Sequence, residues 1–341
     1  MVDVQVGAHH DVDGVRVEPG RTEIGQERAV ALLRRYIGAG AVPQGLLFSG
    51  EEGVGKEKAA RAFAAALLCR NPGTDGACGS CHDCLLLGSG AHPNFLFIAP
   101  ETQFLRINEI RALREELSLK AFSDRPRVAI LCPADRMTPQ AANALLKTLE
   151  EPPAGAHLIL VAHRASILMP TIVSRCQRVP FFPLAADAVA KILSRHPDVA
   201  GEHPRPVIAL AAKVSGGSPG RALSLLPGLA EERETWLALL TRLSPGGAVK
   251  LAESWKGEGD TPGRLAAPLS LVRDLSLLSS GGGADIMNED LREPLASAAL
   301  QLPANGWGAA FRELLSISRM PPQPQKRLML EAFFFGLHGK G

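Results

Sequence analysis

The sequence lacks several features that would place it in a class directly. No apolar run reaches the roughly 18–20 residues that a membrane span needs, and the N-terminus has no charged segment followed by an apolar one. Basic residues number 37 and acidic residues 35, so the charge balance gives no electrostatic reason for the chain to bind nucleic acid by itself. No internal repeat is apparent. Without a membrane span or a signal segment, we expect a cytoplasmic protein. Its 341 residues are enough for two or three domains.

Residues 50–57 read GEEGVGKE and match a phosphate-binding loop except at the last position. In the G-x4-G-K-[ST] pattern, backbone N–H groups surround phosphate, the lysine reaches the terminal phosphates and a hydroxyl binds Mg²⁺. The candidate nucleotide-binding residues of the loop are Gly50, Gly53, Gly55 and Lys56. Glu57 replaces the hydroxyl, which adds negative charge beside a triphosphate and removes a neutral metal ligand. We interpret the loop as that of a former nucleotide hydrolase.

Four of the six cysteines lie within sixteen residues, at Cys69, Cys78, Cys81 and Cys84. In a reducing compartment such a cluster predicts a metal site rather than disulfides. Four thiolates fill the tetrahedral shell of Zn²⁺ and leave no position open for water, so we predict a structural zinc site. The alternative is a redox dithiol formed by Cys81 and Cys84, which would leave the other two cysteines unexplained.

Strand and helix signals alternate over residues 22–182 and predict an α/β domain with a parallel sheet covered on both faces. Thr138 and Pro139 predict a helix start, because threonine can cap a first turn and proline fits the first helical position. Pro152 and Pro153 stop that helix. The expected strands are residues 42–49, 94–99, 127–131, 158–162 and 179–182, and further expected helices are residues 58–68 and 107–117.

From residue 183 onward the strand signals vanish and helical patterns separated by Gly/Pro-rich joints follow. The expected helices are residues 187–195, 206–214, one from Arg221, 231–243, 263–279, 289–301, 306–318 and 323–337. We therefore expect a flexible tail (residues 1–20), an α/β domain (21–182), a small helical domain (183–230) and a C-terminal helical domain (231–341).

Six motifs, in this order, resemble the clamp-loader branch of the AAA+ ATPases over residues 22–225. They are IGQE (24–27), the glycine-rich loop, the cysteine cluster, NALLKTLEEPP (143–153), SRC (174–176) and GGSPGRAL (216–223). The resemblance implies a P-loop AAA+ parallel-sheet domain with an inserted zinc module (69–84), a small helical lid domain and a C-terminal all-α bundle that acts as a collar. It also implies a heteropentamer with ATP-hydrolysing gamma/tau subunits and a clamp-opening delta subunit, which loads the sliding clamp onto primed DNA.

Active motor subunits of this branch end a strand in an Asp-Glu-Ala-Asp type motif. Against that pattern, Cys132 replaces the metal-binding aspartate, Pro133 replaces the catalytic glutamate, and Asp135 matches the last aspartate. Together with Glu57, three catalytic groups are missing, so we expect an accessory subunit that does not hydrolyse ATP. Two interpretations of its loop stay open: Lys56 and the glycines hold a phosphate weakly, or they persist only because the turn needs them. Two alternatives stay open: an active gamma/tau-type ATPase, and a zinc-stabilised DNA-binding module.

The resemblance also gives roles to two arginines. Arg175, within SRC, is expected to reach the ATP site of a neighbouring subunit in trans as an arginine finger, because a planar, permanently charged guanidinium can stabilise charge on a transferring phosphate. Arg221 is expected either to contact the nucleotide of its own subunit or to pack its helix. Lys147, Glu150 and Glu151 are expected on an exposed helix face, which is a candidate for a subunit contact.

Overall fold

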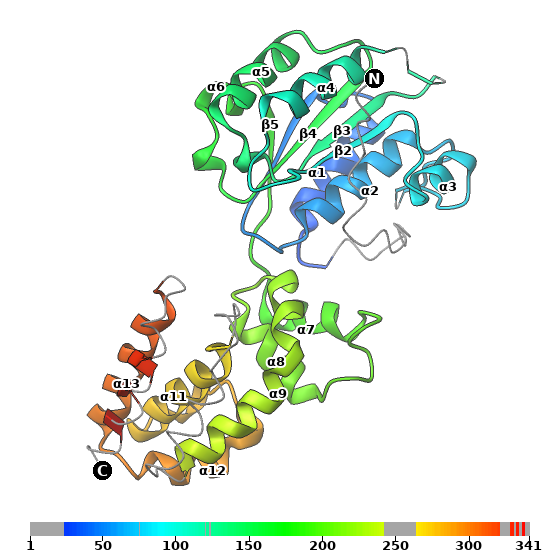
Figure 1. The fold of residues 1–341 in the computed structure, drawn as a ribbon. Coiled ribbons are helices and arrows are strands. Elements are labelled where there is room, and N and C mark those ends of the chain that lie inside the picture. Colours follow the sequence, from blue (N-terminus) through cyan, green and yellow to red (C-terminus); the bar gives the residue numbers. More distant parts are fainter. Residues whose placement is uncertain are drawn as a thin grey trace. The chain divides into compact units, whose positions relative to one another are not determined.

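The computed structural model describes residues 24–241, apart from residues 75, 120 and 123, and residues 264–320, 328–330, 332–333 and 336–337. The chain divides into two units, one ending at Leu184 and one beginning at Ala185, and each is described by itself (Figure 1). This division falls two residues after the predicted boundary at 182/183. The predicted tail, residues 1–20, lies outside the described residues.

A five-stranded parallel sheet forms the centre of the first unit, as predicted, with the strand order β2-β3-β4-β1-β5. The strands are β1 (Gly45–Ser49), β2 (Phe95–Ile98), β3 (Arg127–Leu131), β4 (Ala156–Ala162) and β5 (Gln177–Pro180). The prediction for β5, residues 179–182, was wrong at both ends. Gln177 and Arg178 are exposed on this edge strand, so its sequence carries little of the apolar signal used to find the buried strands.

Helices cover both faces of the sheet (Figure 1). Successive strand residues point to opposite faces. Leu47, Ala129 and Leu160 belong to one hydrophobic core with residues of α4 (Ile107–Ser118), α5 (Pro139–Glu150) and α6 (Pro170–Val173). On the other face, α2 (Lys56–Leu68) contacts β1, β3 and β4, and is itself joined by α1 (Glu27–Gly38) and α3 (His82–Gly88).

The start of α5 confirms the predicted cap. Thr138 Oγ1 accepts a hydrogen bond from the backbone N–H of Ala141 at 3.3 Å, and Pro139 occupies the first helical position. The helix ends at Glu150, two residues before the two prolines that forbid its continuation. Its last residue is therefore a carboxylate at the carbonyl end of a helix.

The described part of the second unit is helical, as predicted, with two short 3₁₀ turns, at Gly283–Asp285 and Glu289–Leu291. In the described residues up to 320, its α-helices are α7 (Ala186–Ser194), α8 (Arg205–Val214), α9 (Pro219–Thr241), α11 (Ala266–Ser279), α12 (Arg292–Ala299) and α13 (Ala304–Ser318). Within the predicted helix 323–337, residues 328–330, 332–333 and 336–337 are helical, and the others lie outside the described residues. The predicted lid–collar boundary at 230/231 falls inside α9, which is broken by the non-helical residues Pro227 and Gly228. That boundary stays a prediction.

A buried polar cluster ties the loop before α12 to α11 and α9. Asp274 on α11 is completely buried and accepts hydrogen bonds from the backbone N–H of Met287 and Asn288 at 2.8–2.9 Å. Arg233 on α9 donates to the Asn288 side chain at 2.9 Å. Because each polar group has a partner, the cluster fixes the loop without leaving an unsatisfied buried charge. Around it, Trp236 and Trp307 fill the hydrophobic core.

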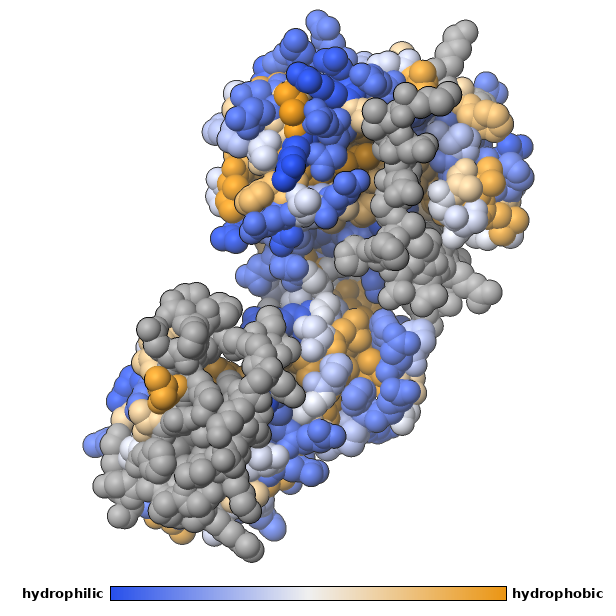
Figure 2. All heavy atoms as spheres, viewed as in Figure 1, coloured by the Kyte–Doolittle hydropathy of each residue, from blue (hydrophilic) through white to orange (hydrophobic). Residues whose placement is uncertain are grey.

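Among the described residues, large hydrophobic side chains that are exposed include Leu85 on α3, Phe182 and Leu300. On the view drawn in Figure 2, the described part of the first unit is mainly hydrophilic, with small hydrophobic groups between polar residues. Across the described ranges, no helix has both the length and the apolar character needed to cross a lipid bilayer.

Candidate functional site

The glycine-rich loop lies between β1 and α2, the strand–loop–helix context that its pattern requires. Gly50, Gly53 and Gly55 all have positive φ angles, of 152°, 75° and 98°. Gly50 also has no room for a side chain, because a Cβ there would lie 2.2 Å from the carbonyl oxygen of Phe181. The glycines are therefore required by the turn itself, whether or not the loop meets a phosphate.

Lys56 is the first residue of α2 and is buried, with 3% of its surface exposed. Its Nζ donates to the carbonyl oxygens of Gly50, at 2.8 Å, and of Glu51. It also lies 3.4 Å from Nδ1 of His163. Burial lowers the pKa of Lys56, while the nearby Cys132 and Asp135 oppose that shift. The ammonium group thus binds the loop's own backbone, which holds the turn closed.

The carboxylate of Glu57 contacts the side chains of two other residues, Arg61 and Cys132. Its Oε1 accepts from Arg61 Nε at 2.8 Å, and its Oε2 lies 3.7 Å from Sγ of Cys132. Burial, followed by the charge of Glu57, raises the pKa of Cys132 to about 12, so the thiol is neutral at pH 7. The guanidinium of Arg61 in turn stacks over Phe97, 3.8 Å from the ring centroid. Glu57 and Cys132, two of the three positions at which the sequence differs from the pattern of active motor subunits, are therefore in contact.

Asp135 and His163 lie near Lys56, at the edge of the sheet where the parallel strands end. Asp135 Oδ1 accepts the backbone N–H of His163 at 2.9 Å, so the carboxylate fixes the residue that follows β4. Burial, followed by the charge of Lys56, lowers the pKa of His163. Sequence reasoning missed His163. The sequence pattern could have indicated it, because His163 directly follows β4 as Cys132 directly follows β3. The carboxyl ends of parallel strands meet at one edge of a sheet, where ligand sites form.

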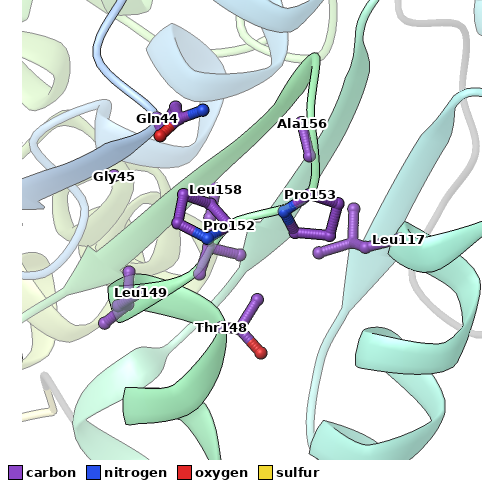
Figure 3. Close-up of a pocket in the computed structure, with 9 residues that line it drawn as sticks. All are labelled: Gln44, Gly45, Leu117, Thr148, Leu149, Pro152, Pro153, Ala156 and Leu158. Atoms are coloured by element: carbon purple, nitrogen blue, oxygen red, sulfur yellow. The ribbon is translucent and has the colours of Figure 1, made fainter.

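A small cavity lies at the opposite edge, around the first residues of β1 and β4 (Figure 3). It has a volume of about 10 Å³, which is room for about one water molecule and far too little for a nucleotide. Thr148 Oγ1 lines it and is buried without a hydrogen-bond partner. The cavity is lined by Gln44, Gly45, Leu117, Thr148, Leu149, Pro152, Pro153, Ala156 and Leu158.

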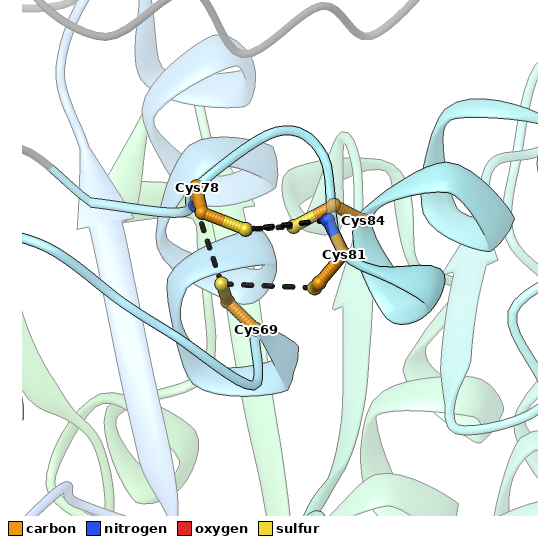
Figure 4. Close-up of side chains that lie close together, drawn as sticks. All are labelled: Cys69, Cys78, Cys81 and Cys84. Atoms are coloured by element: carbon orange, nitrogen blue, oxygen red, sulfur yellow. Dashed lines mark hydrogen bonds between the residues drawn. The ribbon is translucent and has the colours of Figure 1, made fainter.

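The four clustered cysteines converge in space (Figure 4). Their Sγ atoms all lie within 4.8 Å of one another, and the Cys69–Cys81 and Cys78–Cys84 pairs are each 3.9 Å apart. A tetrahedral ion with metal–sulfur bonds of about 2.3 Å needs sulfurs about 3.8 Å apart. These residues could therefore hold a metal ion, and the convergence of all four favours that use over a dithiol of Cys81 and Cys84 alone.

Local structure positions these sulfurs. Cys69 follows the last residue of α2 and Cys81 precedes α3, while Gly79 makes a turn between them with a φ of 73°. Backbone N–H groups point at the sulfurs, from Cys78 to Cys69 at 3.2 Å and from Cys81 to Cys78 at 3.3 Å. Backbone N–H groups of Ser80 and Cys81 lower the pKa of Cys78 to about 6, whereas burial raises the pKa of Cys69 and Cys84. A cation would favour the thiolate form of all four.

Polar residues outside the predicted metal site attach this cluster to the sheet. Asp83, which is 4% exposed, accepts from Arg70 Nε at 2.7 Å and lies 3.7 Å from Nε2 of His92. The hydrogen bond from Arg70 lowers the pKa of Asp83. His92 Nδ1 accepts the backbone N–H of Asn94, whose side chain binds the backbone of Phe122 in both directions. The contacts run from the cysteine module to the loop after α4.

Arg175 lies far from the glycine-rich loop of its own chain. Its backbone oxygen lies beside Gly45, the first residue of β1, and is 3.1 Å from the position that a Cβ would occupy there. Gly50 of the glycine-rich loop lies at the other end of β1, directly after its last residue. Five strand residues span roughly 16 Å. The guanidinium is 37% exposed and is bound to Glu150 at 2.7 Å and to the carbonyl of Thr171 at 3.0 Å. The structure thus separates Arg175 from Lys56.

Arg221 lies in the first turn of α9 and is exposed. Its backbone N–H donates to Ser218 Oγ at 3.1 Å, which caps the helix. Within the described ranges, its guanidinium makes no hydrogen bond or ion pair, and both roles expected of Arg221 stay predictions.

Residues 25–185 match the protein family described as DNA polymerase III, delta subunit. The DNA polymerase III subunit delta' of Pseudomonas aeruginosa is 38% identical over 215 residues, which cover 61% of this chain and 64% of the relative. That of Bacillus subtilis is 36% identical over 164 residues, or 48% of this chain and 50% of the relative. That of Escherichia coli is 31% identical over 267 residues, or 77% of this chain and 78% of the relative. The chain thus spans only about half to two thirds of the first two relatives and more of the third.

Proposed function

The chain belongs to the family of DNA polymerase III delta' subunits, and from this premise we propose that it is a clamp-loader subunit that does not hydrolyse ATP. In this role it acts in the cytoplasm with gamma/tau and delta subunits and helps to load the sliding clamp onto primed DNA. The observation that carries the proposal is the contact between Glu57 and Cys132, at the two positions where an active centre would hold magnesium.

The chemistry of these residues supports the absence of hydrolysis. Magnesium prefers oxygen ligands, and the neutral thiol of Cys132 is a poor substitute for a carboxylate. The Glu57 carboxylate is occupied by Arg61 at 2.8 Å. Pro133 carries no group that could orient a water molecule for attack on a phosphate. Gly50, Gly53, Gly55 and Lys56 keep the shape of the loop, and Lys56 binds the loop's carbonyl groups.

Arg175 supplies a positive charge in trans to a neighbour's ATP. It is half-exposed and lies far from the loop of its own chain, which supports a role at the phosphate of another subunit. A guanidinium is suited to this role because it is permanently charged and presents several donors in one plane.

The metal of the cysteine cluster is zinc, and its role is structural. Cys69, Cys78, Cys81 and Cys84 would hold it, and four sulfurs complete a tetrahedral shell. Bound there, zinc would cross-link the end of α2 to the start of α3. In the accompanying AAA+ architecture, the first unit is the α/β domain with this module inserted, α7, α8 and the start of α9 form the lid, and the later helices form the collar.

The absence of hydrolysis is tested with the isolated full-length chain and labelled ATP. We expect no release of phosphate above that of a buffer blank, with a gamma/tau subunit as the positive control. Turnover by the pure chain at a rate comparable to that control would reject the proposal and favour an active ATPase.

The role of Arg175 is tested in the reconstituted complex. Arg175→Ala should leave assembly unchanged and slow DNA-stimulated ATP hydrolysis, because loss of an arginine finger lowers phosphate-transfer rates by about 10³–10⁵ at the affected site in other systems. Arg178→Ala is the matched control, an exposed arginine three residues away on β5. Equal turnover by wild type and Arg175→Ala would reject the role in trans.

A further inference from the structure

The side chain of Arg175 is held at two points from two different helices. Nη1 donates to the carbonyl of Thr171 on α6 at 3.0 Å, and Nη2 donates to Oε1 of Glu150, the last residue of α5, at 2.7 Å. A guanidinium has five donor hydrogens in one plane. Two of them meet these acceptors, so three are left to meet a phosphate.

The backbone below this side chain is fixed as well. The Arg175 N–H donates to the carbonyl of Ile172 at 3.1 Å, and the next residue, Cys176, is buried. Gly45 allows the close approach, because a Cβ there would lie 3.1 Å from the Arg175 carbonyl and 3.3 Å from Leu149. Freedom in this arginine is therefore confined to its side chain, whose charged end is restrained by Glu150 and by the Thr171 carbonyl.

The position of Glu150 is unfavourable for its own helix. Negative charge at the carbonyl end of a helix opposes the helix dipole, and the next residue, Glu151, is also acidic. Helix stability thus gives no reason for a carboxylate at this position. The ion pair with Arg175 gives one, since the guanidinium compensates the charge.

We propose that Glu150 is a positioning residue for Arg175, which orients the guanidinium before it meets the phosphate of a neighbouring subunit. This inference rests on the proposed role of Arg175 in trans. A free arginine side chain has many rotamers, and restricting them in advance reduces the entropy lost when the charge is placed against the phosphate. The pair is half-exposed and therefore weak, so a phosphate with several negative charges can still draw on the guanidinium.

Glu150 also has an effect that opposes this orientation: its negative charge weakens the attraction between Arg175 and a phosphate. The two effects predict opposite results when Glu150 is removed. If orientation dominates, hydrolysis slows. If Glu150 mainly neutralises Arg175 or holds it back, hydrolysis accelerates.

The test measures ATP hydrolysis by the reconstituted complex, with clamp and primed DNA, for Glu150→Ala, Glu150→Gln, Arg175→Ala and the double variant Glu150→Ala/Arg175→Ala. We expect Glu150→Ala to lower kcat about twofold to fivefold, the range that an exposed ion pair supports, without changing KM for ATP. Glu150→Gln keeps an acceptor oxygen, so its kcat should fall less than that of Glu150→Ala. The double variant should match Arg175→Ala, because Glu150 acts only through that arginine.

Glu151→Ala is the matched control, since it removes the neighbouring exposed carboxylate, which has no ion pair within the described part of the chain. Wild-type or faster hydrolysis by Glu150→Ala, with Arg175→Ala slow, would overturn this inference and leave the proposed function intact. A double variant slower than Arg175→Ala by the full Glu150→Ala factor would also overturn it. If Arg175→Ala itself turned over like wild type, the role in trans would fail first, and this inference with it. Glu150→Gln gives the same decision if Glu150→Ala does not assemble.

Discussion

Replacement of Cys84 by serine is the most direct test of the metal site. With both opposed sulfur pairs 3.9 Å apart, the cluster already has the dimensions of a tetrahedral zinc site, for which about 3.8 Å is needed. Serine removes one of four sulfurs and supplies a weaker ligand. We expect the zinc content of the purified chain to fall from about one ion per molecule to well below one.

The cost to stability follows from what the module buries. Leu87, 6% exposed, and Ala77, 4% exposed, lose their packing if the module opens, and Arg70 and Asp83 lose an ion pair that is partly exposed on the Arg70 side. Burial of a leucine contributes about 1.5–3 kcal/mol, and the buried alanine adds less. A loss of about 3 kcal/mol lowers the Tm of a unit of this size by roughly 6–12 °C.

Zinc is measured by elemental analysis of protein purified without chelator, and unfolding by calorimetry. Cys176→Ser is the control, because it changes a buried cysteine outside the cluster and should keep its zinc. Wild-type protein with no zinc and four freely titratable thiols would refute the assignment, as would a Cys84→Ser variant that kept the full zinc content.

Two further predictions concern stability. Gly50→Ala should destabilise the first unit by at least about 2 kcal/mol, because its Cβ would lie 2.2 Å from the Phe181 carbonyl oxygen, whereas Gly90→Ala, with a positive φ and open space, should lose only about 1 kcal/mol. Equal urea midpoints for the two variants would contradict this. Burial lowers the pKa of His157, so the unfolded chain accepts a proton near pH 6.5 that the folded chain resists, and stability should fall as the pH drops below about 6.5. His157→Gln should make that fall shallower between pH 7 and 5 in urea titrations, and an unchanged slope would show that His157 does not contribute.

Much of the α/β unit could be predicted from sequence because its strands are buried on both faces. The apolar run 127–131 predicted both ends of β3 correctly, and Thr138 with Pro139 predicted the start of α5. β5 was misplaced because an edge strand keeps polar residues such as Arg178. The glycine-rich loop and the cysteine spacing were readable because each is a local pattern in one short segment.

Contacts between distant segments could not be predicted in the same way. His163 reaches Lys56, and Glu150 reaches Arg175, only because neighbouring strands and helices bring together residues far apart in sequence. The network from Asp83 through His92 to Asn94 likewise depends on how α3 packs beside β2.

The sequence by itself determined which chemical groups the chain possesses and lacks: a loop with lysine but no hydroxyl, a strand end with a thiol in place of a carboxylate, and four cysteines at metal spacing. Only the tertiary structure decided how these groups meet. Covalent order fixes residue type and local spacing, but the parallel sheet fixes which strand ends share an edge. It is the sheet that joins Glu57 to Cys132 and sets Arg175 at the opposite edge.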